Sequence, residues 1–292
     1  MRTRLLTPAT LAVLAAAFTM AFVTAPSHAA LIQGVPGGVL WLKADSLSLS
    51  DGQTVNTWNN SVTGPGTAGN AVRDSSDPAF VASAIGGMPA VDFDDGDGTE
   101  ENPDGDSMRV NSFQNSFVDN KTFTIFMVTD AENTVFGPTP TDRRGSINRF
   151  YPRRGALTYQ TSGSVREDLS IASQAGAAEI TVFQHTGSQI EAWLNGVSQG
   201  TAAIGLGNIG GDQPLYVSWW PGGVPRTGQM AELMWFTESL SRPEIHIIGD
   251  YLSNKYGIGF NFVVPEPATC VVWGLGLMCL ALGGRRRRRV AD

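Results

Sequence analysis

The chain has 292 residues, and only two are cysteines, Cys270 and Cys279, which both lie in an apolar run near its end. The rest of the chain therefore offers no thiolate metal site, no cysteine nucleophile and no disulfide. Without the charged residues of the two terminal segments described below, 25 acidic residues stand against 13 basic ones, a balance that disfavours binding to nucleic acid and favours cation binding.

The N-terminus has the pattern of a secretory signal peptide, residues 1–29. Arg2 and Arg4 precede an apolar stretch over residues 11–23, and small residues precede a cleavage site after Ala29. The pattern predicts export through the Sec pathway. An uncleaved anchor is the alternative, although the apolar run is short for a span of about 20 residues.

Residues 30–262 are predicted to form one all-β domain, an antiparallel sandwich or barrel, because short apolar runs alternate with turn residues and no long amphipathic helices lie between them. Asn195-Gly196 is the strongest hairpin signal. The predicted strands are Val39–Leu42, Phe123–Val128, Ile180–Gln184, Ile190–Leu194, a return strand from Val197, Leu215–Trp219 and Met230–Phe236.

An acidic segment between two of these runs is the first candidate site. Carboxylates at alternate positions with glycines between them suit the six to eight oxygen ligands of Ca²⁺. A loop of this composition that binds no ordered ion is the alternative. The candidate ligands are Asp92, Asp94, Asp95, Asp97, Asp104 and Asp106.

Arginines gather around Phe150 and Tyr151, where Arg149 and Arg153 are candidates for binding the carboxylates of an acidic polysaccharide. A solvated loop that pairs with the domain's own acids is the alternative.

Two adjacent tryptophans, Trp219 and Trp220, precede Pro221 and a pair of glycines. Neighbouring side chains of a strand point to opposite faces, so at least one indole is expected to face outward or lie in a loop, where it could stack on a sugar ring. In the alternative, Trp219 belongs to the core and Trp220 covers the rim of the sheet.

One helix is predicted near the end of the domain. Ser241 and Glu244 form a capping box around Pro243, Lys255 lies in the last turn, and Gly257 suits the position after the helix. A helix at this place in the chain is expected to pack on the edge or rim of the sandwich.

Three stretches resemble laminin-G-like, concanavalin A-like jelly rolls: residues 87–94 (GMPAVDFD), 190–196 (IEAWLNG) and 228–257. The resemblance implies a two-sheet jelly-roll sandwich with one short C-terminal helix. It implies no single function, because the fold carries lectins, glycanases, adhesion modules and passive domains.

Catalysis finds little support in the sequence. Glycanases of this fold place two carboxylates on a Glu-x-Asp-x-x-Glu strand, which this chain lacks, and Glu232 has no acidic partner two or five residues on. His185 and His246 lie beside no nucleophile elbow or zinc spacing. We therefore expect no enzyme, with a spatially assembled glycoside hydrolase or lyase as the alternative.

The C-terminus reads as a membrane stop. Residues 268–284 carry no charge, and 17 residues span about 25 Å as a helix. The adjacent cations stay cytoplasmic by the positive-inside rule, which places residues 30–262 outside. These cations are Arg285, Arg286, Arg287, Arg288 and Arg289.

Pro265, Glu266 and Pro267, followed by this apolar run and the arginines, resemble a PEP-CTERM sorting signal over residues 263–292. The resemblance implies a transient inner-membrane anchor, processing by an exosortase, and delivery to the cell surface or extracellular matrix alongside polysaccharide. An uncleaved tail anchor is the alternative. The sequence as a whole predicts a non-catalytic, carbohydrate-binding or adhesive surface protein, with a purely structural matrix component as a further alternative.

Overall fold

The computed structural model describes residues 30–93, 106–110, 113, 122–130, 140–142, 149–153, 156–160, 166–172, 176–207, 215–218 and 228–262. The predicted signal peptide (1–29) and the predicted sorting segment (263–292) lie outside these residues. No helix in the described ranges is long and apolar enough to cross a membrane.

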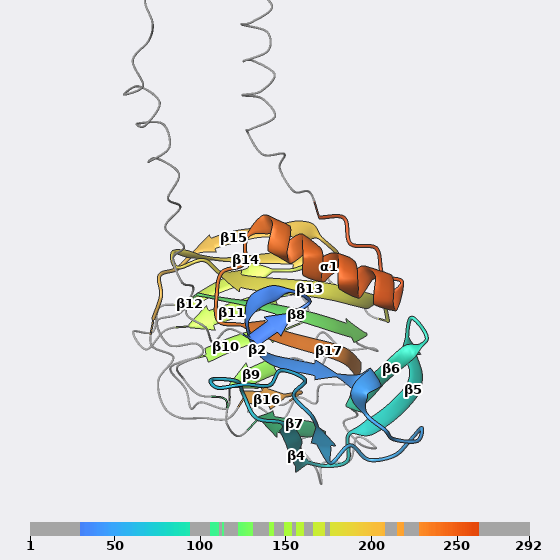
Figure 1. Ribbon diagram of the computed structural model, residues 1–292. Helices are drawn as coiled ribbons and strands as arrows, with labels where there is room; N and C mark the ends of the chain where they lie inside the picture. Colours follow the sequence, from blue (N-terminus) through green and yellow to red (C-terminus); the bar gives the residue numbers. More distant parts are fainter. Residues whose placement is uncertain are drawn as a thin grey trace, which may run out of the picture.

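The larger sheet has nine antiparallel strands (Figure 1). They are β1 (Ala30–Ile32), β2 (Val35–Lys43), β5 (Ala79–Ile85), β6 (Met88–Phe93), β8 (Phe123–Asp130), β13 (Ala178–His185), β14 (Gln189–Leu194), β15 (Val197–Ala203) and β17 (Gly228–Phe236). The order is β1-β2-β17-β8-β13-β14-β15, while β6 pairs with β17 and β5 pairs with β6. β17 and β8 therefore form the centre of the sheet.

A second layer covers one face of this sheet. A five-stranded sheet contains β3 (Thr57–Trp58), β4 (Ala71–Ser75), β7 (Ser107–Val110), β16 (Leu215–Val217) and β9 (Pro140–Asp142), in that order. A three-stranded sheet contains β10 (Arg149–Arg153), β11 (Ala156–Gln160) and β12 (Arg166–Ser170), and it lies between β9 and β15. The antiparallel all-β sandwich is confirmed, although the second layer comprises two sheets where one was predicted.

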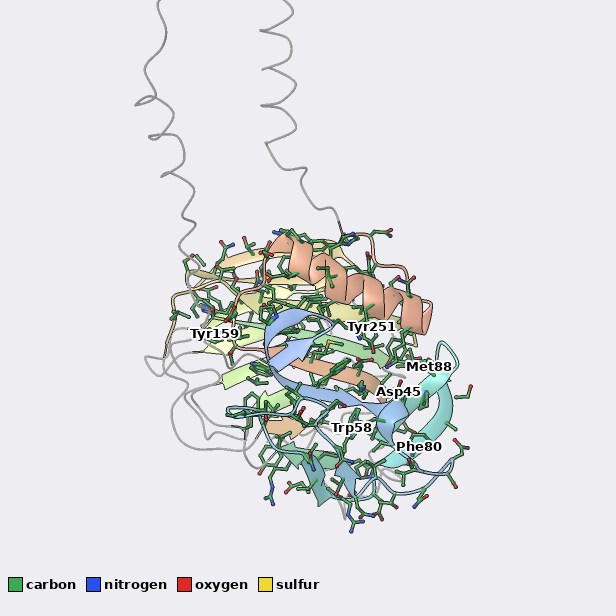
Figure 2. The ribbon with its side chains drawn as sticks, viewed as in Figure 1. Asp45, Trp58, Phe80, Met88, Tyr159 and Tyr251 are labelled. Carbon is green, nitrogen blue, oxygen red and sulfur yellow. The ribbon has the colours of Figure 1, made fainter. Side chains whose placement is uncertain are left out.

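The nine-stranded sheet is apolar on both faces. Along β8, Phe123 and Ile125 belong to the core between the two layers, whereas Phe126 and Val128 belong to a second core on the opposite face. Figure 2 shows both regions, with Trp58 and Tyr159 in the inner core and Tyr251 on the outer side. A sheet with two apolar faces needs a cover on each.

The predicted helix is α1 (Arg242–Tyr256), and it provides the second cover. Its capping box at Ser241 and Glu244 is confirmed, and Gly257 adopts the left-handed conformation at φ 68°. Its placement on the rim was wrong, because α1 lies across the outer face of the nine-stranded sheet (Figure 1). Its buried side chains Ile245, Ile248 and Leu252 complete the second core.

The predicted hairpin at Asn195-Gly196 is confirmed, with φ angles of 50° and 80°. Positive φ at both positions is the requirement of a type I′ turn. Residues 258–262, which we call the C-terminal strap, run from the end of α1 to this turn. There the amide of Asn261 donates a hydrogen bond of 2.9 Å to the carbonyl of Asn195.

Candidate functional site

The acidic segment is described only at its two ends. Asp92 lies on β6 and is partly buried, while Asp106 is 8% exposed and accepts a 3.0 Å hydrogen bond from the amide of Asp77. The other candidate ligands, Asp94, Asp95, Asp97 and Asp104, lie outside the described residues. Within the part of the chain that is described, no group of three or more His, Cys, Asp or Glu side chains could hold a metal ion.

The aromatic and basic candidates are also described in part. Within the described residues β16 ends at Val217, and Trp219 and Trp220 lie outside them. Arg149 and Arg153 are the first and last residues of β10, so this stretch forms a strand where a loop was the alternative. The sorting residues Pro265, Glu266 and Pro267 lie outside the described ranges, as do the five arginines of the membrane stop.

Strand pairing nevertheless brings together the described residues that flank the acidic and the tryptophan segments. Phe93, where the chain enters residues 94–105, pairs with Gly228, where it leaves residues 219–227. Met108 pairs with Val217, so β7 begins beside the end of β16. The two segments therefore share both of their anchor points, one in each layer of the sandwich.

The strongest electrostatic feature among the described residues is Glu232, a carboxylate that is 1% exposed in the centre of the larger sheet. A β-bulge in β17 determines its direction, because Met230 pairs with Thr129 and Glu232 with the adjacent Val128. The extra residue changes the alternation of side chains. As a result Met230 faces the inner core, whereas Glu232 faces α1.

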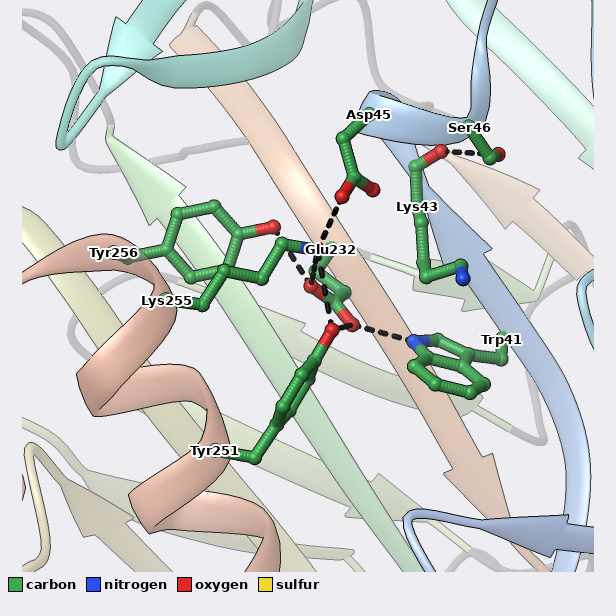
Figure 3. Close-up of polar contacts among 8 residues, drawn as sticks. All are labelled: Trp41, Lys43, Asp45, Ser46, Glu232, Tyr251, Lys255 and Tyr256. Carbon is green, nitrogen blue, oxygen red and sulfur yellow. Dashed lines mark hydrogen bonds and ion pairs between the residues drawn. The ribbon is translucent and has the colours of Figure 1, made fainter.

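Four donors converge on this carboxylate (Figure 3). Oε1 accepts hydrogen bonds from the indole of Trp41 and, at 3.2 Å, from the hydroxyl of Tyr251. Oε2 accepts from the ammonium of Lys255 at 2.8 Å and from the hydroxyl of Tyr256 at 2.7 Å. Three of the donors belong to α1, so the cluster fixes the helix to the sheet.

The protonation states of the cluster support this arrangement. Burial, and then the charge of Glu232, raise the pKa of Tyr251 to about 12 and that of Tyr256 well above its usual range. Burial lowers the pKa of Lys255, but the charge of Glu232 and the hydrogen bond to it raise the pKa by more. Lys255 also lies 3.1 Å from the carboxylate of Asp45, so it stays charged between two acids while both tyrosines stay neutral.

This geometry is that of a structural lock rather than of a catalytic pair. Both oxygens of Glu232 accept hydrogen bonds from side chains of the protein. In a glycosidase the scissile bond lies between two carboxylates, but between Glu232 and Asp45 that place is taken by Lys255. In the sequence Glu232 stands out as a carboxylate on an apolar strand, but its four partners were not predicted. The available signal was the spacing of Tyr251, Lys255 and Tyr256 on one side of the predicted helix, opposite a single charge in an apolar strand.

The two histidines of the body lie on opposite faces of the larger sheet. His246 is on α1, while His185 is fully buried at the end of β13 beside Phe123 and Tyr159 in the inner core. Nδ1 of His185 accepts a hydrogen bond from the amide of Gly187 at 2.9 Å, and Nε2 lies 3.3 Å from the carbonyl of Gly205. These partners favour the neutral tautomer that carries its proton on Nε2.

His185 is expected to make stability depend on pH. Burial lowers the pKa of His185 in the folded state, so the unfolded chain takes up the proton first as the pH falls below about 6.5. The free energy of unfolding should fall by at most about 1.4 kcal/mol per pH unit in this window. Urea denaturation between pH 7.5 and 5.5 measures the slope, which should flatten in His185→Asn. An unchanged slope in that variant would contradict the assignment.

Comparison with known proteins gives a likeness of fold. No family model matches the chain, and no curated protein matches it significantly. Domain 4 of AbnA, a GH43 extracellular arabinanase from Geobacillus stearothermophilus solved with arabinotriose, has a TM-score of 0.52 at 13% identity over 70% of this chain and 94% of that domain.

Two toxin structures are similar at the same level. The binding domain of Paraclostridial Mosquitocidal Protein 1 has a TM-score of 0.53 at 10% identity, over 75% of this chain and 53% of that one. Botulinum neurotoxin type C, whose cell entry depends upon interaction with two ganglioside molecules, has a TM-score of 0.51 at 11% identity, over 74% and 51%. The match spans about half of each toxin structure, and it supports a β-sandwich.

Proposed function

We propose that the chain is an exported, non-catalytic surface or extracellular-matrix protein that binds polysaccharide through a laminin-G-like jelly roll, residues 30–262. In this proposal residues 1–29 direct export, and residues 263–292 hold the chain transiently in the inner membrane until an exosortase processes it. Ca²⁺ held by the acidic segment assists binding, and Trp220 stacks on the sugar.

The observation that carries the proposal is the shared anchoring of the two candidate segments. The pairs Phe93–Gly228 and Met108–Val217 fix both ends of the acidic segment beside both ends of the tryptophan segment. The two segments that carry the candidate carboxylates and indoles are distant in sequence, but they begin and end at the same two places in the fold. An aromatic platform beside polar groups and a cation is a common arrangement for holding a sugar.

Two further findings support this function. The arabinanase domain of similar fold was solved with arabinotriose, and the match covers nearly its full length. The strap, from which the predicted sorting segment continues, lies on the α1 side of the larger sheet, whereas β7 and β16 lie on the opposite side. In a chain held by its C-terminus, β7 and β16, which flank the two candidate segments, would therefore face away from the point of attachment.

The test is retention of the full chain on immobilised polygalacturonate and on immobilised arabinan, with Ca²⁺ and with EDTA. Trp220→Ala is expected to weaken retention about fivefold, the size of one aromatic contact. EDTA should weaken it as well if the acidic segment holds the ion.

The matched control is Val197→Ser, which removes an apolar side chain that is 53% exposed on the β14–β15 hairpin. This variant should bind like the wild type. If neither matrix retains the chain, the result would favour a purely structural component. Release of oligosaccharides from the matrix would favour the glycoside hydrolase or lyase.

A further inference from the structure

Lys43 is exceptional among the basic side chains of the described structure. Of the five lysines and arginines whose side chains are described, four form ion pairs: Arg73, Arg109, Arg242 and Lys255. The ammonium of Lys43 instead lies 4.4 Å from the ring centroid of Trp41. In an acidic domain, a lysine without a carboxylate partner is an available site for an anion.

The hydrogen bonds of Glu232 explain why Lys43 lies on the ring of Trp41. Lys43 lies directly opposite Glu232 in the pairing of β2 with β17, where an ion pair would be expected. The carboxylate of Glu232 is already occupied by Lys255 and three other donors. Figure 3 shows the ammonium of Lys43 turned away from Glu232, on the ring of Trp41.

The aromatic surface beside Lys43 is rigid. The indole of Trp41 is fixed by its hydrogen bond to Glu232, and Tyr251 meets it edge to face, with ring centroids 6.1 Å apart and planes at 82°. Both side chains are only partly buried. The carboxylate of Asp45, whose side chain is 34% exposed, adds an acceptor at the rim. Fixed rings beside a free cation form a preorganised site.

We propose that Lys43, Trp41 and Tyr251 form a subsite for an acidic sugar residue, a uronate of an extracellular polysaccharide. The ammonium of Lys43 donates to the sugar carboxylate, and the exposed edges of the two rings contact the apolar face of the sugar. This inference rests on the proposed function. The residues of the subsite are nevertheless separate from the two candidate segments, because they lie on the α1 face of the larger sheet, on the other side from β7 and β16.

The test is isothermal titration calorimetry of the full chain with trigalacturonate, and with neutral galactotriose as the reference ligand. Lys43→Gln should weaken trigalacturonate binding about tenfold, the loss of one hydrogen bond between charged groups. Lys43→Arg should retain binding, and galactotriose should bind weakly to all variants. The preference for the acidic ligand should decline with added salt.

Arg73→Gln is the matched control, since it also removes one positive charge but from an exposed ion pair on β4. It should bind like the wild type. Equal affinities of Lys43→Gln and wild type, or an equal loss in Arg73→Gln, would overturn the subsite. Weaker trigalacturonate binding in Lys43→Gln but not in Trp220→Ala supports the subsite, even where the retention test contradicts the proposed function. Weaker trigalacturonate binding in Trp220→Ala alone overturns the subsite and leaves the proposed function supported.

Discussion

Glu232→Leu is expected to lower the free energy of unfolding by about 3 to 5 kcal/mol, because it removes one partner of a buried ion pair. The variant leaves Lys255, with 11% of its side chain exposed, beside Asp45 alone, and it deprives Trp41, Tyr251 and Tyr256 of their acceptor. Each buried donor without an acceptor adds its own penalty. Urea denaturation monitored by circular dichroism measures the change.

The double variant Glu232→Leu, Lys255→Met separates the ion pair from the loss of packing. It should recover part of the stability, since no buried charge then remains without its principal partner. Glu238→Leu is the control, because Glu238 is exposed just beyond β17 and should change stability by about 0.5 kcal/mol or less. A loss in Glu232→Leu as small as in this control would show that the cluster does not hold α1.

The elements predicted from the sequence are those with local signals. The turn at Asn195-Gly196 needs two positive φ angles and the helix needs Ser241 and Glu244, so a few adjacent residues determine each. Strands such as β8 were found because their apolar runs are bounded by polar residues. The short strands β3, β4 and β9 were not predicted, because they form by pairing with other strands and local composition shows little of that.

The place of α1 required knowledge of the sheet. The run Phe123–Val128 is apolar at every position but Thr124, which indicates burial on both faces, but the sequence does not say what covers the second face. Only the assembled order of β2, β17, β8 and β13 creates a surface wide enough for a helix of 15 residues.

Spacing along the helix brings Tyr251, Lys255 and Tyr256 together, but it does not predict that Glu232 is their common acceptor. Trp41 and Glu232 are 191 positions apart in sequence, and the bulge at Ala231 reverses the face that simple alternation would give to Glu232. The candidates chosen by local composition, such as Trp219 and Asp95, lie outside the described residues and remain predictions. Strand pairing adds the proximity of their anchors, which no local pattern contains.

Phe262→Ala is expected to destabilise the fold by about 3 kcal/mol, the usual effect of removing a buried phenylalanine ring. Phe262 is 7% exposed at the end of the strap, with its ring centroid 5.8 Å from that of Trp193 and 5.4 Å from the guanidinium of Arg242. It also stacks on Phe260, which packs so closely on Gly249 that an added Cβ there would lie 1.9 Å from its ring.

The strap therefore contacts α1 at Gly249 and Arg242, whereas Glu232 binds the C-terminal part of the helix. The two variants should therefore loosen different parts of α1. Hydrogen exchange should accelerate first at the amides from Ile245 to Gly249, the first that the helix protects, in Phe262→Ala, and first near Tyr251 and Tyr256 in Glu232→Leu. Ile247→Ala is the control, since its side chain is 49% exposed on α1. Uniform acceleration along α1 in both variants would mean that the helix detaches as one unit. Because the chain continues from Phe262 into the predicted sorting segment, a pull on that segment would load this aromatic contact before any strand of the sandwich.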